Sequence, residues 1–355
     1  MERVHRRDWH AIARVEQIAA PGDFLTLDLF GEPLVAVRGA DHEVRVFSRV
    51  CRHRFADVTA DREGNVPECG KLEHFECPYH MWSYRLNGEL INAVDMQRRA
   101  EFAADRFNLV EFDSAVWQGF VFVKLDNDST APLGMEPLST CIGHYDFSEW
   151  RLVGSRDWGR VGANWKMVME NFMEFYHHMG AHLYTVETAL PGLSAEVGDG
   201  ADPSTYVARV ATSPAGADRE VEGALQPAAL LPPPEHFDTW DCGGSLIFSR
   251  FPTFMVAAFC DFSYWYQLTP TSAGDHELKV HALVHESNLD RVDDALVAAA
   301  YEFFAPIQEE DAAMTTRVQK NMTSGAVHGG VLHDQEFPLL HMQRYLAGML
   351  KNGKA

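Results

Sequence analysis

"CRHRFADV" occupies residues 51–58, and "ECPYHMWSYRLNGEL" occupies residues 76–90. The first stretch holds a C-x-H pair and the second a C-x-x-H pair. Short β-rich runs alternate with turn residues in this part of the chain, so we expect each pair to lie in a loop between strands. Two loops that present two thiolates and two imidazoles can form one metal site. The four candidate ligands are Cys51, His53, Cys77 and His80.

The spacing within each pair distinguishes two kinds of metal site. Structural zinc sites usually pair ligands across two to four intervening residues, whereas C-x-H has one. In a Rieske centre, two cysteines bind one iron of a 2Fe-2S cluster and two histidines bind the other. The pattern therefore favours a Rieske-type 2Fe-2S cluster, and a structural zinc site is the alternative.

Composition limits the class of protein. The chain has 355 residues, of which 46% are hydrophobic, enough for two domains with substantial cores. Its formal net charge of -21 disfavours nucleic acid as the main partner, because phosphate binding needs a cationic surface. No run approaches eighteen apolar residues, and the start, MERVHRRDWH, lacks the apolar core of a signal peptide. We expect a cytoplasmic protein that neither crosses a membrane nor binds nucleic acid.

The chain divides into two predicted domains. Short β-rich runs from Gly22 to about Leu125 predict a small all-β domain. The polar, proline-containing stretch LDNDSTAPLGMEPLST, residues 125–140, is the expected boundary. We therefore predict one domain over residues 1–128 and a second over residues 129–355.

The second domain mixes helices and strands. Residues 244–286 have the alternation of strands, and residues 290–322 have helical spacing. Residues 191–237 are rich in Gly, Ala, Ser and Pro, so we predict a long irregular excursion or lid there.

A second candidate metal site lies in "MENFMEFYHHMGAH", residues 169–182. We predict a helix over residues 161–185, on which His177 and His182 are separated by a rotation of roughly 500°. They share no helical face unless the helix breaks, and Gly180 supplies a break between them. Two histidines and one carboxylate on one face of Fe(II) form the facial triad of non-haem iron oxygenases. The third ligand must come from elsewhere in the chain.

Together these stretches resemble the large, oxygenase subunit of Rieske non-haem iron oxygenases. The resemblance extends from about Trp9 to the C-terminal helix, although Phe55 and Met81 stand where the family usually has glycine. It implies an α+β protein with an N-terminal all-β Rieske domain. The implied C-terminal catalytic domain has an antiparallel sheet flanked by helices, the helix-grip or START-like fold. The implied cofactors are a 2Fe-2S cluster and a mononuclear Fe(II).

Rieske proteins of respiratory complexes share the cluster motif but usually carry an extra cysteine in each cluster loop. Here the corresponding places hold Ala56 and Tyr79. This difference favours a soluble protein with a cluster of lower potential.

The resemblance also implies the third iron ligand. The matching segment, PIQEEDAAMTTRVQKNMTSG at residues 306–325, contains three consecutive acidic residues. Asp311 fits the family pattern best and is preferred to Glu310. On a helix, Glu309 and Glu310 project away from Asp311, so we expect them to face solvent or the neighbours of the ligands.

Other roles follow from the same resemblance. Glu174 corresponds to the acidic residue that bridges an iron histidine, here His177, to a cluster histidine of the next subunit in a homotrimer, here His80. Asn171 matches a family asparagine near the open iron positions. For His178 we expect packing or a hydrogen bond next to the site rather than metal binding.

The expected function is that of a terminal oxygenase. It would use O2 and electrons from NAD(P)H, delivered by a separate flavin or ferredoxin reductase, because the chain has no glycine-rich nucleotide-binding fingerprint. It would hydroxylate or oxidatively demethylate a small organic substrate. Glutamate at position 174 resembles the group that acts on quaternary ammonium compounds, which favours a betaine-like substrate.

Two alternatives remain open from the sequence. Aromatic residues between Ser245 and Leu268 could cage a trimethylammonium group, stack on an aromatic ring substrate, or simply form the core of the sheet. The first alternative is therefore a monooxygenase or dioxygenase of an aromatic ring. The second is a Rieske electron-transfer protein without catalysis.

Overall fold

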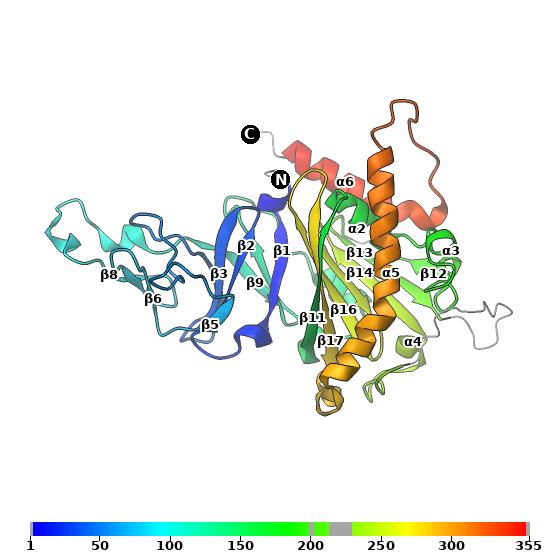
Figure 1. The fold of residues 1–355 in the computed structure, drawn as a ribbon, viewed down its shortest axis with the longest axis horizontal. Helices are drawn as coiled ribbons and strands as arrows, with labels where there is room; N and C mark the ends of the chain where they lie inside the picture. The colour runs from blue at the N-terminus through cyan, green and yellow to red at the C-terminus, as the bar shows by residue number, and fades with distance from the viewer. Residues whose placement is uncertain (1–2, 199–201, 213–228, 353–355) are drawn as a thin grey trace. The chain divides into compact units, whose positions relative to one another are not determined.

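The structure is a computed structural model that describes residues 3–198, 202–212 and 229–352. The chain forms two compact units, residues 1–133 and residues 134–355, and each has its own seven-stranded sheet (Figure 1). In the described part of the chain, no helix is long and apolar enough to cross a membrane.

The first unit is built almost entirely of strands. They are β1 (Trp9–Arg14), β2 (Asp23–Leu29), β3 (Glu32–Arg38), β4 (Val44–Ser48), β5 (Cys69–Lys71), β6 (Phe75–Glu76), β7 (Ser83–Tyr84), β8 (Leu90–Asn92), β9 (Glu111–Trp117) and β10 (Phe120–Lys124). The short 3-10 helices are His5–Arg7, Val15–Ile18, Met96–Arg98 and Ala104–Phe107. An antiparallel sheet has the order β1-β10-β9-β4-β3-β2-β5, and β6-β7-β8 form a smaller sheet. The all-β character predicted for this part of the chain is confirmed.

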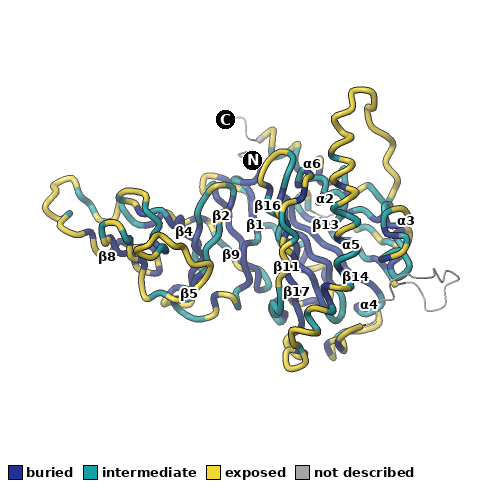
Figure 2. Tube along the Cα trace, in the orientation of Figure 1, coloured by how far each residue is buried: buried dark blue, intermediate teal, exposed yellow. Residues whose placement is uncertain are grey.

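Two hydrophobic cores stabilise this unit. One lies in the large sheet around Leu34, Val46 and Val121. The other lies beneath the two metal-binding motifs and includes Cys51 and Cys77 themselves. Figure 2 shows the larger sheet as mostly buried, whereas the loops around β6 and β8 are largely exposed. The cysteines are therefore fixed from below by packing, while the loop tips face outward.

The second unit is an antiparallel sheet flanked by helices. Its strands are β11 (Trp150–Val161), β12 (Ala195–Val197), β13 (Thr205–Ala211), β14 (Gly244–Arg250), β15 (Phe254–Ala258), β16 (Phe262–Pro270) and β17 (His276–His285). Its helices are α1 (Glu136–Cys141), α2 (Trp165–Met173), α3 (His178–Ala181), α4 (Thr239–Cys242), α5 (Asp294–Asn321) and α6 (Phe337–Asn352). Short 3-10 helices cover Phe147–Glu149, Gly192–Ser194, Glu286–Arg291 and Asp334–Glu336. The sheet order is β11-β17-β16-β15-β14-β13-β12. The predicted helix-grip arrangement is confirmed.

Helix α5 is the element that positions the site in the second unit. It lies across one face of the sheet and contacts α2, and it changes direction along its length (Figure 1). Pro306 lies inside α5, where it removes one backbone hydrogen bond and explains the bend. The bend falls five residues before Asp311.

The predicted helix over residues 161–185 is wrong. Helix α2 ends at Met173, and Glu174 has extended backbone angles (φ -113°, ψ 152°). Gly180, the predicted break, lies inside the short helix α3 instead. The chain therefore leaves the helix before His177 rather than between the two histidines.

The predicted irregular excursion over residues 191–237 is also partly wrong, because β12 and β13 add two strands to the sheet. Residues 229–237 contain no helix or strand, as predicted, and residues 199–201 and 213–228 lie outside the described residues.

Candidate active site

The two cluster motifs form loops with the same backbone hydrogen bonds. The N–H of Cys51 donates to the carbonyl of Ala56, and the N–H of Phe55 donates back to the carbonyl of Cys51 (2.8 and 3.1 Å). The second loop repeats this pattern between Cys77, Met81 and Trp82 (2.8 and 3.0 Å).

Both loops need a left-handed residue at the same place. Phe55 has φ 64° and Met81 has φ 58°, a conformation that usually favours glycine. Both residues thus adopt this conformation without glycine. Both side chains are exposed, so each Cβ is accommodated by pointing its side chain outward.

The four side chains at these loops fit a 2Fe-2S cluster. Both cysteines are buried, and burial raises the pKa of the Cys77 thiol. The rings of His53 and His80 lie 4.5 Å apart between centroids, and the buried Nδ1 atom of each has no hydrogen-bond partner. Buried polar atoms without a partner are rare in native proteins. Two such nitrogens beside two buried thiols are what a cluster held by two imidazoles and two thiolates requires.

Aromatic side chains support the loops. The ring of His53 is stacked on Trp82, with centroids 4.6 Å apart and planes 5° from parallel. The Tyr84 hydroxyl lies 3.3 Å from Cys51 Sγ and accepts a hydrogen bond from the N–H of Arg52 (3.2 Å). Because the Arg52 N–H occupies a lone pair of the hydroxyl, its hydrogen is free to point at the sulfur.

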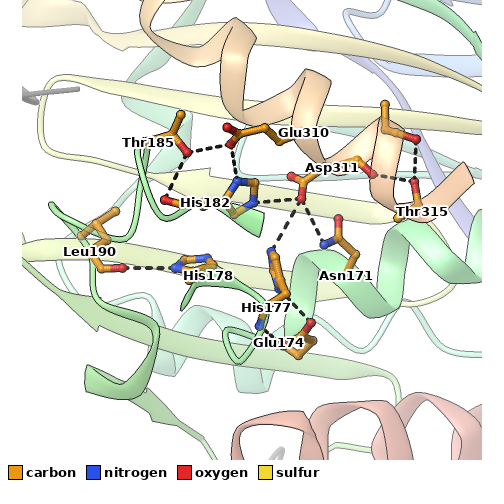
Figure 3. A network of polar contacts seen from close by, with 11 residues as sticks. Asn171, Glu174, His177, His178, His182, Thr185, Leu190, Glu310, Asp311 and Thr315 are labelled. Carbon is orange, nitrogen blue, oxygen red and sulfur yellow. Dashed lines mark hydrogen bonds and ion pairs between the residues drawn. The ribbon is translucent and has the colours of Figure 1, made fainter. Parts of the chain in front are cut away.

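The second predicted set meets in the other unit. One ligand atom from each of His177, His182 and Asp311 lies within 4.8 Å of the other two. Asp311 Oδ1 is 2.9 Å from His182 Nε2 and 3.6 Å from His177 Nε2 (Figure 3). His177 immediately precedes α3 and His182 immediately follows it, so a single helical turn holds both rings. Asp311 reaches them from α5.

Two further carboxylates hold the outer nitrogens of these histidines. Glu174 Oε1 is 2.8 Å from His177 Nδ1, and its Oε2 accepts the backbone N–H of His177 (3.1 Å). Glu310 Oε2 is 2.7 Å from His182 Nδ1 and also accepts a hydrogen bond from the Thr185 hydroxyl (2.7 Å). Each carboxylate thus selects the tautomer with hydrogen on Nδ1 and a free lone pair on Nε2.

These contacts distinguish the three consecutive acidic residues at positions 309–311 of α5. Glu309 is exposed, Glu310 contacts the outer side of His182, and Asp311 faces both Nε2 atoms. The geometry supports Asp311 rather than Glu310 as the third ligand. Sequence reasoning missed Thr185, because a threonine three residues after a histidine carries no recognisable pattern.

Charge accumulates at the centre. Burial opposes ionisation of Asp311, but the hydrogen bond and charge of His182, with His177 and Asn171, outweigh it and lower the Asp311 pKa. Burial likewise opposes protonation of His182, but Asp311 and Glu310 outweigh it and raise the His182 pKa.

The remaining predicted residues lie beside this centre. Asn171 donates from Nδ2 to Asp311 Oδ1 (3.1 Å), which places it on the carboxylate rather than on a histidine. His178 donates from Nδ1 to the carbonyl of Leu190 (3.1 Å), and burial lowers its pKa to about 3. His178 is thus a neutral side chain that packs and anchors a loop, as expected.

A cavity of about 480 Å³ adjoins the three candidate ligands. Its size lies within the roughly 300–1,000 Å³ of small-molecule sites. Most of its wall is apolar, and its aromatic members are Phe172, Phe175, Phe259, Phe262, Tyr264, Tyr266, Phe303 and Phe304. The site can therefore enclose a small organic molecule next to a metal.

Each unit matches a known protein family. Residues 8–107 match the Rieske [2Fe-2S] domain, and residues 144–352 match the ring hydroxylating alpha subunit (catalytic domain). The chain belongs to the ring hydroxylating alpha subunit family. Both candidate sites lie within the matched ranges, and the resemblance predicted from the motifs is confirmed.

Two curated relatives of this family member are oxygenase subunits. The carnitine monooxygenase oxygenase subunit of Escherichia coli (strain K12) is 31% identical over 188 residues, which cover 51% of this chain and 47% of the relative. The glycine betaine monooxygenase oxygenase subunit of Pseudomonas aeruginosa (strain UCBPP-PA14) is 31% identical over 191 residues, 54% of this chain and 43% of the relative. The chain thus spans about half the length of the curated relatives it matches.

A solved structure shares the fold. It is that of a quaternary ammonium Rieske monooxygenase, solved for insights into carnitine oxidation by gut microbiota and inter-subunit electron transfer. The TM-score is 0.77 at 20% identity, with 98% of this chain and 90% of the other covered.

Proposed function

We propose that the chain is the terminal oxygenase component of a Rieske non-haem iron oxygenase system. It would use O2 and electrons from NAD(P)H, delivered by a separate reductase, to hydroxylate or oxidatively demethylate a small organic substrate. The observation that carries this proposal is the convergence of His177 Nε2, His182 Nε2 and Asp311 Oδ1 beside a largely apolar cavity. A Rieske protein confined to electron transfer would need neither feature.

The proposed ligands follow from the fit of each site. Cys51, His53, Cys77 and His80 would hold the cluster, and His177, His182 and Asp311 would hold the mononuclear iron. When bound, the cluster would supply electrons and the iron would activate dioxygen. Neutral imidazoles and a carboxylate suit Fe(II), and three ligands leave positions free for O2.

The protein's own residues prepare this centre. Glu174 and Glu310 hold the Nδ1–H groups, so both rings stay aimed at one point before a metal arrives. Asn171 restrains the Asp311 carboxylate through Oδ1. The phenylalanines of the cavity wall keep bulk water away and hold the substrate carbon near the centre.

The substrate class we favour is a quaternary ammonium compound. The names of the two curated relatives support it, and so do the aromatic rings of the cavity, because each ring face can attract a cation by roughly 0.5–2 kcal/mol. The same rings can stack on an aromatic substrate, which remains the alternative.

We further propose a homotrimer in which electrons pass between subunits, with Glu174 between His177 and the cluster ligand His80 of the next subunit. Support comes from the contact of Glu174 with His177 and from the inter-subunit electron transfer named for the structural relative.

The test combines metal content with turnover. Purified protein should contain about two irons and two labile sulfides for the cluster and one further iron per chain. Oxygen uptake with NADH and a compatible reductase is then measured over ammonium compounds and aromatic rings, with product masses. Asp311→Ala should retain the cluster but form no product, and the matched control Glu309→Ala should behave as wild type. Stoichiometric zinc in place of iron would refute the proposal.

A further inference from the structure

The charges that line the cavity are all of one sign. Among the described residues, its wall includes three carboxylates and no lysine or arginine. The carboxylates are Glu174, Asp261 and Asp311. Within the described part of the chain, a substrate that enters this cavity therefore meets negative charge and no lysine or arginine that could receive an acidic group.

Two of these carboxylates belong to the iron centre. The two positive charges of Fe(II) would face Asp311 together with Glu174 and Glu310, which hold the histidines. Three carboxylates already exceed the charge of the metal. No positive charge at this centre is left over to attract a substrate carboxylate.

The third carboxylate of the wall is that of Asp261. This residue lies in the turn between β15 and β16 and is distant in sequence from the proposed iron ligands. Its Oδ1 accepts the N–H of Phe262 (2.7 Å), and its Oδ2 accepts the N–H of Leu230 (2.8 Å). Both donors are neutral backbone groups, so the carboxylate is fixed in place but its charge is not neutralised. It cannot turn away from an approaching anion without losing both bonds.

Two hydroxyl donors of the wall are occupied. The hydroxyls of Thr212 and Tyr264 donate to the carbonyls of Gly243 (3.1 Å) and Ala300 (3.3 Å). The Tyr266 ring packs edge-on against Phe172, with ring centroids 4.9 Å apart, and forms part of the aromatic wall.

From this arrangement we propose that the substrate of the cavity bears no carboxylate. It is an ammonium compound whose remainder is uncharged or cationic, and Asp261 disfavours zwitterions that carry a carboxylate. The inference rests on the proposed oxygenase function and narrows its substrate class. It sets this chain apart from relatives named for carnitine and glycine betaine, both of which carry a carboxylate.

The physical reason is the cost of burying an unpaired charge. A carboxylate that enters an apolar cavity gives up its hydration, and here it gains no partner while it approaches Asp261. An ammonium group loses hydration as well, but aromatic faces and Asp261 compensate it. We expect a carboxylate to weaken binding about 100-fold or more relative to a neutral analogue.

The experiment uses pairs of compounds that differ in the acidic group alone. The pairs are choline and glycine betaine, carnitine methyl ester and carnitine, and benzyl alcohol and benzoate. Binding to the anaerobic, iron-loaded protein is measured by calorimetry, and product yield is measured after chemical reduction of the cluster and addition of O2. Neither measurement depends on a partner reductase.

Carboxylate-free members should bind more tightly and give more product. Asp261→Asn removes the charge but keeps one acceptor oxygen, so it should reduce the preference at least tenfold. Asp290→Asn, an exposed change outside the cavity, should leave it unaltered. Thermal unfolding identifies any loss of folding in Asp261→Asn, and the wild-type pairs decide the question without that variant.

The outcomes separate the two proposals. Equal or tighter binding of the carboxylates would overturn this inference and leave the oxygenase function standing. The same conclusion would follow if no member of any pair bound. Full metal content without product from any compound that binds would refute the oxygenase function, while the binding ratios would still decide the inference.

Discussion

At the residue scale, replacing the adjacent carboxylates Asp311 and Glu310 should affect iron binding to different degrees. Asp311→Ala should abolish the mononuclear iron and turnover but keep the cluster spectrum, because the two sites lie in different units. Glu310→Gln should keep an iron site with affinity roughly 10–100-fold weaker, since it holds only the outer nitrogen of His182. Iron per chain is measured after dialysis, with exposed Glu309→Ala as the control. Iron retained in Asp311→Ala but lost in Glu310→Gln would reverse the assignment.

The Tyr84 hydroxyl has its own measurable effect on the cluster. Its hydrogen bond to Cys51 Sγ stabilises the more negative, reduced state, so Tyr84→Phe should lower the reduction potential. A difference of about 1 kcal/mol corresponds to roughly 40 mV for one electron. Tyr79→Phe, an exposed change, serves as the control in a spectroelectrochemical titration. An unchanged potential in Tyr84→Phe would show that the hydroxyl does not point at the sulfur.

Site residues could be predicted from the sequence where the ligands lie close together along the chain. The cluster ligands come in two pairs with short spacing, so Cys51 and His80 could be identified without a structure. The third iron ligand is more than a hundred residues from His182, and nothing local distinguishes Asp311 from its two acidic neighbours. Only the resemblance selected it, and the support comes from which nitrogen each carboxylate faces.

Strands were predictable where the chain has short apolar runs between turn residues. Strands β14 to β17 are such runs, largely buried, and were expected, whereas β11 was missed. It has register shifts between Leu152 and Gly154 and between Asp157 and Gly159, and each shift interrupts the alternation of buried and exposed positions. The end of the helix at Glu174 was predicted at the wrong residue for another reason. A contact with a residue distant in sequence fixes the chain there. Gly192 lies against the carbonyl of Phe175, where an added Cβ would be 2.0 Å from the oxygen.

Two glycines therefore test how the histidine segment is held. Gly192→Ala must displace the segment before His177, so we expect a loss of about 1–3 kcal/mol in the free energy of unfolding and weaker iron binding. Gly180→Ala meets no atom within 4 Å and lies in α3, so it should be tolerated or slightly stabilising. Thermal unfolding and iron titration measure both. A larger loss of stability and iron binding in Gly180→Ala than in Gly192→Ala would show that Gly180 determines where the helix breaks.

For the whole molecule, we predict that joint action of the two proposed metal sites, which lie in different units, depends on Glu174. Glu174→Gln should keep both metal sites, because it is a ligand to neither, yet product formation should fall steeply. The amide cannot accept a proton as the carboxylate can, and it alters the hydrogen bond to His177 Nδ1. Metal content, cluster reduction and single-turnover yield are measured on one sample, and a normal yield would reduce Glu174 to a structural residue.

Mixed oligomers decide in which subunit Glu174 acts. Two inactive subunits are expected: Cys51→Ser lacks the cluster, and Asp311→Ala lacks the mononuclear iron. When both are co-expressed with different tags, mixed oligomers should regain activity, because the cluster of one subunit serves the iron of the other. Glu174→Gln added to the iron-carrying subunit should abolish this rescue, because the carboxylate contacts that subunit's His177. The same change in the cluster-carrying subunit should have no effect, because its Glu174 lies beside an iron site that Asp311→Ala has emptied. Equal rescue in both arrangements, or activity in a separated monomer, would contradict electron transfer between subunits through Glu174.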